Sequence, residues 1–265
     1  MVKTIDTLVE DIGKVLENGS DVSDDFVRDM ATSFARLIKN RLSTERGEPS
    51  LRMSNIGSPC NRKLWYTMNA KGEREKLDAS TKFKFLFGDI IEEVVLFLAK
   101  VAGHKVEGEQ GVLEIEGIKG HRDAVIDGVV VDVKSASSFS FNKFKNHTLS
   151  ENDAFGYEDQ LQSYMYASKN DPLVIDKTRG AFLAVDKQLG HMVLDVHEKK
   201  DFPYDELYKF KKSMVKREDP PEKSFHLIPE GKSGNMKLGV NCSYCEFKKL
   251  CYPNIRTFLY SNKPG

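Results

Sequence analysis

The feature that most constrains this fold is a strand hairpin closed by Asp127 and Gly128. An Asp-Gly pair between two apolar segments is typical of a type I′ turn, in which both central residues need positive φ. With these two residues as the loop, Ile126 pairs with Val129 and the strands run outward from that pair. Residues 129–133 are almost continuously apolar, which predicts a strand buried on both faces.

The same hairpin predicts a cluster of charged side chains on one face. Counting outward from the turn sets Asp123 opposite Asp132 and His121 opposite Lys134, and directly paired residues share a face. Two facing carboxylates repel each other, and charges inside a buried strand need a partner or an ion. A divalent cation such as magnesium prefers oxygen ligands and would turn this repulsion into coordination. With Lys134 to hold a water or stabilise an anionic transition state, these residues outline a metal-dependent phosphodiester hydrolysis site; the alternative is a solvated polar face.

The composition sets only broad limits on function. The chain has 265 residues, which suits one large domain or one domain with extensions. Its 40 basic and 40 acidic residues cancel, so contacts with nucleic acid must come from local basic patches. No apolar run is long enough to span a membrane, and the N-terminus lacks the apolar core of a signal peptide. We therefore expect an intracellular protein in a reducing cytoplasm.

The order of the expected elements indicates an α/β core with a mixed sheet. Periodicity and capping residues predict, in chain order, helices at 1–18, 25–41, 60–66 and 81–101, strands at 111–115, 118–126 and 129–134, a polar loop dotted with aromatic residues at 135–153, a helix at 157–168, strands at 180–186 and 191–197, and a helix from 203 to near 216. We divide the chain into a helical N-terminal region (1–53), a core (54–218) and a cysteine-rich C-terminal segment (219–265).

The long apolar helix offers a third acidic residue for the site. Gly88 and Glu92 are four residues apart and share a helix face. A glycine inside a helix costs about 1 kcal/mol relative to alanine, so Gly88 suggests a close approach of another chain segment. Apolar neighbours surround Glu92, which favours it as a ligand beside the two hairpin aspartates, whereas Glu93 points about 100° away. The plainer alternative places both glutamates on the wet side of the helix.

Two further groups of residues suggest contacts with DNA. Gln160 and Tyr164 lie four residues apart on one helix and could contact a phosphate and help to place Lys134. More commonly, such a pair is an exposed amide beside a half-buried ring. Cations alternate with rings in two segments, a composition that suits single-stranded DNA. The loop rings could equally form a small core under a long connection. These cations and rings are Arg62, Lys63, Trp65, Tyr66, Phe139, Phe141, Lys143, Phe144 and Lys145.

The four cysteines form a second candidate site. Cys242, Cys245 and Cys251 follow a Cys-x2-Cys-x5-Cys spacing, and Cys60 stands far upstream. Disulfides are disfavoured in a reducing compartment, and chance would not crowd three thiols into so short a segment. Four thiolates indicate either structural zinc or an iron–sulfur cluster, and the spacing does not separate the two. Either would join the N-terminal region to the C-terminus.

Taken together and in order, these motifs resemble the RecB-like branch of the PD-(D/E)XK nucleases. The similarity runs from 54 to 251 and is greatest to the iron–sulfur exonucleases typified by CRISPR-associated nucleases and the AddB helicase–nuclease subunit, and to small phage exonucleases. The matching motifs are Cys60 followed by basic residues and Trp-Tyr, Gly88-x3-Glu92, Gly120-His121-x-Asp123, Asp132-x-Lys134-Ser135, Gln160-x3-Tyr164 and the C-terminal cysteines. Two positions depart from the family: many relatives carry histidine at position 92, and the acid at position 132 is more often glutamate.

The resemblance implies a restriction-endonuclease-like core and a metal-dependent DNA exonuclease. Glu92, Asp123 and Asp132 would bind one or two magnesium or manganese ions, and Lys134 would position the attacking water. Gln160 and Tyr164 would complete the phosphate site, and His121 would act from outside it. Cys60, Cys242, Cys245 and Cys251 would hold a 4Fe–4S cluster, with structural zinc as the alternative.

The resemblance also implies biological settings. The expected partners are DNA with a free single-stranded end and proteins of a replication, recombination or repair complex, in a bacterial or phage-infected cytoplasm. The alternative function is a non-catalytic DNA-binding subunit of a recombination or spacer-acquisition complex.

Overall fold

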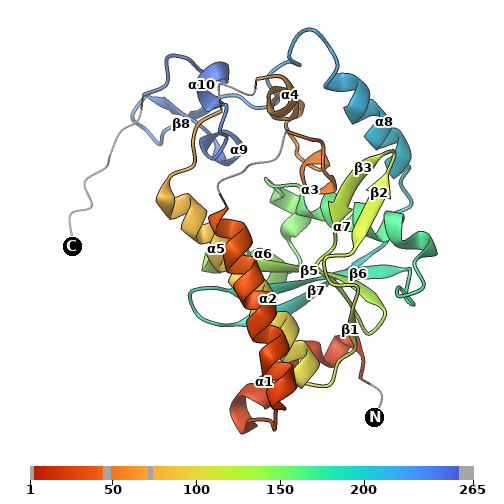
Figure 1. Cartoon of the computed structure of the whole chain (residues 1–265). Helices are drawn as coiled ribbons and strands as arrows, with labels where there is room; N and C mark the ends of the chain where they lie inside the picture. Colours follow the sequence, from red (N-terminus) through yellow and green to blue (C-terminus); the bar gives the residue numbers. More distant parts are fainter. Residues whose placement is uncertain (1–2, 44–48, 71–73, 257–265) are drawn as a thin grey trace, which may run out of the picture.

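A five-stranded mixed sheet forms the centre of the fold, with strands in the order β1-β4-β5-β6-β7 (Figure 1). This computed structural model describes residues 3–43, 49–70 and 74–256. Only β5 and β6 pair in parallel within this sheet, and two small hairpins, β2-β3 and β8-β9, complete the strands of the described residues. The strands are β1 (Val106–Glu107), β2 (Val112–Ile115), β3 (Ile118–His121), β4 (Ala124–Ile126), β5 (Val129–Ala136), β6 (Arg179–Asp186), β7 (Met192–Glu198), β8 (Ile228–Pro229) and β9 (Met236–Lys237).

Helices cover both faces of this sheet. The α-helices are α1 (Leu8–Asn18), α2 (Asp24–Leu42), α3 (Met53–Ile56), α4 (Asn61–Asn69), α5 (Ala79–Val101), α6 (Ser138–Lys145), α7 (Tyr157–Ala167), α8 (Tyr204–Met214), α9 (Val240–Ser243) and α10 (Lys248–Cys251). This arrangement confirms the predicted α/β class with a mixed central sheet flanked by helices, and it is consistent with a restriction-endonuclease-like core. Within the described residues, no helix combines the length and apolarity needed to cross a membrane.

Alternate side chains of β5 enter two different hydrophobic cores. Val129, Val131 and Val133 pack with α1 and α5 on one face of the sheet. Val130 packs on the other face with α3, α6, α7 and α8. The sequence prediction of a strand buried on both faces is therefore confirmed. Because side chains alternate along a strand, Asp132 shares its face with Val130 and points toward α7.

The predicted turn of the hairpin is confirmed. Asp127 and Gly128 have φ angles of 50° and 81°, and Ile126 pairs with Val129. A side chain at position 128 would also collide with Ile175, whose Cβ lies 2.7 Å from where a new Cβ would stand. Glycine is thus required there by both backbone conformation and packing.

The outer part of the predicted hairpin is wrong. The β4-β5 register ends at Ala124 opposite Val131, and His121 pairs with Val112 in the β2-β3 hairpin instead of facing Lys134. The expected strand at 118–126 breaks at Arg122, whose buried guanidinium forms an ion pair with Asp171 at 2.5 Å. This ion pair lies at the break between β3, which pairs with β2, and β4, which stays in the central sheet.

The segment at 135–153 also differs from its prediction as a loop. It contains α6, which begins where the Ser137 hydroxyl accepts a hydrogen bond from the Ser140 amide at 3.4 Å. Phe141 and Phe144 are buried in the core, and only Phe139 of the three rings is exposed. Phe141 and Phe144 therefore belong to a packed core, as one interpretation expected, and only Phe139 is available for contact with DNA.

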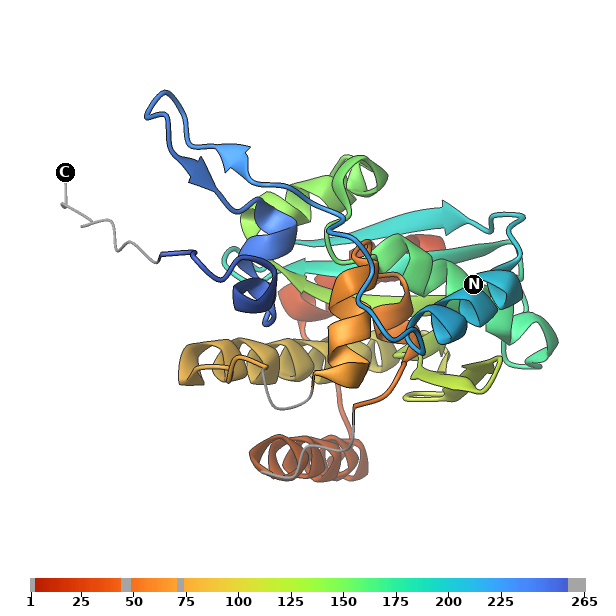
Figure 2. The same ribbon diagram turned by 90° about the horizontal axis from the view of Figure 1, so that it is seen from above.

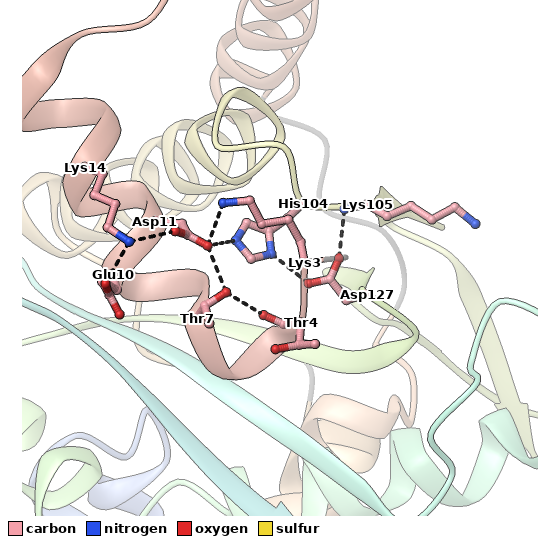
Figure 3. Close-up of polar contacts among 9 residues, drawn as sticks. All are labelled: Lys3, Thr4, Thr7, Glu10, Asp11, Lys14, His104, Lys105 and Asp127. Atoms are coloured by element: carbon pink, nitrogen blue, oxygen red, sulfur yellow. Dashed lines mark hydrogen bonds and ion pairs between the residues drawn. The ribbon is translucent and has the colours of Figure 1, made fainter. Parts of the chain in front are cut away.

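A buried histidine fixes the turn end of the hairpin to α1 (Figure 3). His104 Nδ1 lies 2.7 Å from Asp127 Oδ2, and its Nε2 lies 3.4 Å from Asp11 Oδ2. Lys3 Nζ lies 2.7 Å from the same oxygen of Asp11, and its hydrogen bond holds the pKa of that carboxyl below its usual value. The Lys105 amide donates to Asp127 Oδ1 at 3.0 Å. Every acid in this network faces a base or an amide.

Candidate active site

The candidate site lies at the open end of the same hairpin, where β5 extends beyond its partner strand. β4 begins at Ala124, whereas β5 continues to Ala136. Asp123 stands directly before β4, and its Oδ2 accepts a hydrogen bond from the Val133 amide at 2.7 Å. At Val133 the Asp123 carboxylate thus takes the hydrogen bond that a neighbouring strand would otherwise accept. Because β4 does not extend alongside this part of β5, polar side chains from other elements can approach it.

Asp132 and Lys134 form a buried ion pair on β5. The Asp132 carboxylate is only 1% exposed and pairs with the Lys134 ammonium. Its Oδ1 receives one long hydrogen bond, from Gln160 Nε2 at 3.5 Å, and its Oδ2 has no hydrogen bond of ordinary geometry. Burial lowers the pKa of Lys134, but Asp132 and Asp123 outweigh that effect and raise it overall. The lysine therefore stays protonated, with its Nζ 4.7 Å from the centre of the Tyr157 ring.

Glu92 reaches the site from α5. Burial and then the charges of Asp132 and Asp89 raise the pKa of Glu92 to about 7, although Gln110 Nε2 donates a hydrogen bond to Glu92 Oε1 at 2.7 Å. A Cβ at Gly88 would lie 3.2 Å from Ser135 Oγ, so glycine there permits the close approach of α5 to β5 that the sequence suggested. Glu92 is half-buried and lies close enough to the hairpin acids to feel the charge of Asp132.

The three acids repel one another, and this charge pattern suits a bound cation. Burial and then the charges of Asp132 and Glu92 raise the pKa of Asp123 well above its ordinary value. When all three carboxylates are ionised, a single lysine leaves an excess of negative charge, which a divalent cation with oxygen ligands would neutralise. Among the described residues, however, no three His, Cys, Asp or Glu side chains converge as a ready metal-binding set. In this structure the positive charge beside Asp132 is the Lys134 ammonium, which forms an ion pair with it.

Gln160 and Tyr164 lie on the side of α7 that faces these residues. Gln160 Nε2 donates to the Tyr164 hydroxyl at 2.8 Å as well as reaching Asp132. Tyr164 is buried, and burial followed by the charge of Asp132 raises the pKa of its hydroxyl. His121 lies outside this group: it is exposed, and its Nδ1 is 3.2 Å from the Gln110 carbonyl oxygen.

Two residues of the site were not found from the sequence. Gln110, which donates to Glu92, lies in a connection between strands and carries no sequence signal. Tyr157, whose ring lies against Lys134, is spaced three residues before Gln160 and seven before Tyr164 on α7. That spacing places all three side chains on one helix face and could have pointed to Tyr157.

The four cysteines lie within electrostatic reach of one another and form no disulfide. Burial and then the neighbouring thiols of Cys60, Cys245 and Cys251 raise the pKa of Cys242. Cys60 caps the start of α4, where its Sγ accepts a hydrogen bond from the Lys63 amide at 3.3 Å. Four thiols that lost their protons would repel one another, and a cationic metal centre would relieve that repulsion. Among the described residues, however, the cysteines do not converge as a ready metal-binding set either.

Direct contacts already join α4 to the C-terminal segment (Figure 1). Tyr66 packs with Phe247 and Cys245 in a small hydrophobic cluster, and the two rings lie 5.6 Å apart. The Glu75 amide donates to the Glu246 carbonyl oxygen at 3.0 Å. The two segments predicted to share a metal centre are therefore in contact.

Comparisons with known proteins give only distant similarities. No protein-family model and no curated protein matches the chain. Among solved structures, SSO0001 aligns over 84% of this chain and 96% of its own at 15% identity, with a TM-score of 0.47. An alkaline exonuclease from Laribacter hongkongensis in complex with dAMP aligns over 63% and 85% at 14% identity, with a TM-score of 0.41.

A third solved structure, a phage-related exonuclease from Haemophilus somnus 129PT, aligns over 64% of this chain and 91% of its own at 16% identity, also with a TM-score of 0.41. With TM-scores below 0.5, these likenesses assign neither a family nor an activity to this chain. Any function must follow from its own residues.

Proposed function

We propose that this protein is a metal-dependent DNA exonuclease that hydrolyses phosphodiester bonds. The observation that carries the proposal is the electrostatic coupling of Glu92, Asp123 and Asp132 beside the buried Lys134, with the pKa values of Glu92 and Asp123 raised by burial and mutual repulsion. Such repulsion costs stability in the metal-free protein and persists where a cation is to be bound. A purely structural network would pair these acids, as the network around His104 does.

The three acids are proposed to hold one or two magnesium or manganese ions. Asp132 Oδ2 is buried and pairs with the Lys134 ammonium, and a hard cation that prefers oxygen ligands could take the place of that ammonium. When bound, the metal would lower the pKa of a water and neutralise charge that develops on the phosphate. Metal binding would also free Lys134 from Asp132, because one oxygen would then face the cation.

The remaining side chains are proposed to orient the phosphate and the attacking water. Lys134, protonated and held near the Tyr157 ring, would donate a hydrogen bond to the water or to a phosphate oxygen. Gln160 donates its two amide N–H groups to Asp132 and Tyr164 and would hold both side chains in position beside the phosphate. The Tyr164 hydroxyl keeps its proton because its pKa is raised, so it acts as a donor and not as a base.

The cysteines are proposed to hold a 4Fe–4S cluster, with zinc as the alternative metal. Support comes from the shared electrostatics of Cys242 with the other three thiols and from the packing of α4 on the C-terminal segment. The role would be structural, since a metal that joins distant segments stabilises the folded state. Iron, zinc and sulfide analysis of anaerobically purified protein decides between the two metals, and absence of both would reject the centre.

The proposed substrate is DNA with a free single-stranded end, in replication, recombination or repair in a cytoplasm. The test is incubation with end-labelled single- and double-stranded DNA and Mn²⁺, with Asp132→Asn as the matched inactive control. Release of labelled nucleotides by wild type only is the expected result. If the wild-type protein binds DNA but releases none, the alternative of a non-catalytic DNA-binding subunit replaces the exonuclease.

A further inference from the structure

The C-terminal segment and the residues just before α5 form an open groove of about 1620 Å³. Small-molecule sites usually measure about 300–1,000 Å³, so this groove suits a larger ligand. Six of its lining residues are basic and two are acidic, which gives a net charge of +4 in a chain whose charges otherwise cancel. We call it the basic groove. Its cations are Lys76, Lys223, Lys237, Lys248, Lys249 and Arg256.

Most of this positive charge is not neutralised by the protein itself. Glu75 takes up two of the lysines, with Lys248 Nζ at 3.2 Å and Lys249 Nζ at 3.1 Å from its carboxylate oxygens. Exposed cations that share one groove repel one another, and an anionic ligand would relieve that repulsion. Four exposed cations of the groove make no ion pair within the described residues: Lys76, Lys223, Lys237 and Arg256.

The groove offers charge for phosphates but no open ring for a nucleobase. Proteins that bind single-stranded DNA stack its bases on aromatic side chains. The aromatic residue in this lining is Tyr252, and Lys223 Nζ lies 4.4 Å from the centre of its ring. Its hydroxyl donates a hydrogen bond to the Phe225 carbonyl oxygen at 2.6 Å. Duplex DNA keeps its bases stacked and presents phosphates, so the lining favours a duplex over a single strand.

The β8-β9 hairpin forms one side of the groove and projects from the body of the fold (Figure 2). All the residues of its two strands are exposed. Lys232 lies in the connection between them, and Lys237 lines the groove from β9. The major groove of duplex DNA is about 12 Å wide and admits a two-stranded β-ribbon. The hairpin therefore has the shape and the charge to enter it.

We propose that the C-terminal segment binds duplex DNA, with the β8-β9 hairpin in the major groove and the cations of the basic groove on the adjacent phosphates. This inference rests on the proposed function and names where the double-stranded part of the substrate is held. Lys76 lines the groove just before α5 begins, and from Ala79 to Glu92 this helix rises about 20 Å. About six nucleotides of a single-stranded end span that distance to the candidate active site.

Binding without added divalent cations tests the basic groove. The probes are a fluorescein-labelled duplex of about 16 base pairs and its single strand, followed by fluorescence anisotropy across a range of salt concentrations. The duplex should bind more tightly than the single strand. Changing Lys76→Ala and Lys237→Ala together should weaken duplex binding about tenfold and reduce the slope of log K against log salt by about 2.

The matched control removes the same charge elsewhere. Lys39→Ala with Lys119→Ala changes two exposed lysines that do not line the groove, so its salt slope should equal that of wild type. Equal slopes for wild type and the groove variant would overturn the site. A single strand that binds as tightly as the duplex, and loses as much affinity in the groove variant, would overturn the assignment to duplex DNA.

A modified duplex tests entry of the hairpin. Substituents at the pyrimidine C5 position lie in the major groove, so bulky groups there should weaken binding to wild type about tenfold. Lys232→Ala should weaken binding of the unmodified duplex and leave binding of the single strand unchanged, because Lys232 lies on the hairpin. Equal affinity for modified and unmodified duplexes would overturn this entry.

The two proposals fail in different ways. Absence of all cleavage by wild type with Mn²⁺ counts against the exonuclease and leaves the binding measurements to decide the duplex site. Cleavage with a salt slope that does not depend on Lys76 and Lys237 counts against the duplex site alone.

Discussion

The two ends of the hairpin formed by β4 and β5 carry opposite kinds of charge network. At the turn end, Asp127 faces His104 and an amide, and Asp11 faces Lys3, so the acids are matched (Figure 3). At the open end, Glu92 and the two hairpin aspartates share a single lysine, and the pKa values of two of them are raised. Paired charges at the turn end stabilise the fold, whereas the unpaired carboxylates at the open end are the kind of group that binds a ligand.

The largest expected effect is at the open end. Asp123→Asn should lower nuclease activity by about 10³-fold, because it removes a proposed metal ligand. The same change should raise the melting temperature at pH 8, since it removes a repelling charge while its amide oxygen can still accept from the Val133 amide. Thermal melts and initial rates measure the two effects.

A matched change at Asp132 sharpens this result. Asp132→Asn should abolish activity as well but lower the melting temperature, because it leaves the buried Lys134 ammonium without its partner. A lower melting temperature for Asp123→Asn would contradict the repulsion between Asp123 and its neighbouring carboxylates.

The second effect is at the turn end, where loss of a base should cost stability and not catalysis. His104→Ala should lower the free energy of unfolding by about 3 kcal/mol, because the buried Asp127 carboxylate loses its partner. Urea unfolding measures this change, and the rate per folded molecule should stay near that of wild type. Lys105→Ala is the control, since its ammonium is 68% exposed and its ion pair with Glu107 should contribute under about 1 kcal/mol.

The third effect is a pH dependence of the metal-free protein. The pKa of Glu92 rises from 4.5 to about 7 on folding, so its contribution to stability is complete below pH 4.5 and is lost as the pH rises to about 7. The loss amounts to at most about 3 kcal/mol. Denaturant unfolding in EDTA across this range measures it. Glu92→Gln should remove this loss of stability between pH 4.5 and about 7. A wild-type protein that becomes more stable over the same pH range would refute the raised pKa of Glu92.

The smallest effect concerns the support of Glu92. Gln110→Ala removes the hydrogen bond to Glu92 and should weaken Mn²⁺ binding about tenfold, as loss of an outer partner does at metal sites. Calorimetric titration measures the affinity. Glu109→Gln is a neighbouring control, since Glu109 pairs with Lys100 and not with a proposed ligand. Equal losses in both variants would show a general charge effect and not a specific one.

Local residue patterns were enough to predict the turn of the hairpin, the buried strand β5 and the long helix α5. The Asp127-Gly128 turn follows from the positive φ that the turn needs, and the apolar run fixes β5 as a buried strand. Asp78 begins α5 by accepting a hydrogen bond from the Thr81 amide at 2.7 Å, two residues before the predicted start. These features depend on residues close together in the chain, so local patterns are enough to predict them.

Tertiary structure decided which of these elements meet. The expected strand breaks at Arg122, whose ion pair with Asp171 far along the chain no local pattern predicts. A Cβ on Gly57 would lie 2.7 Å from the Gly156 carbonyl oxygen, so this glycine lets the segment before Cys60 pack directly on the start of α7. The placement of α2 over Glu92 likewise depends on two contacts far apart in sequence. Such contacts arise from complementary packing of surfaces that only the folded chain brings together, which is why the sequence predicted the acids of the candidate site and the helix at 25–41 but not the position of that helix beside them.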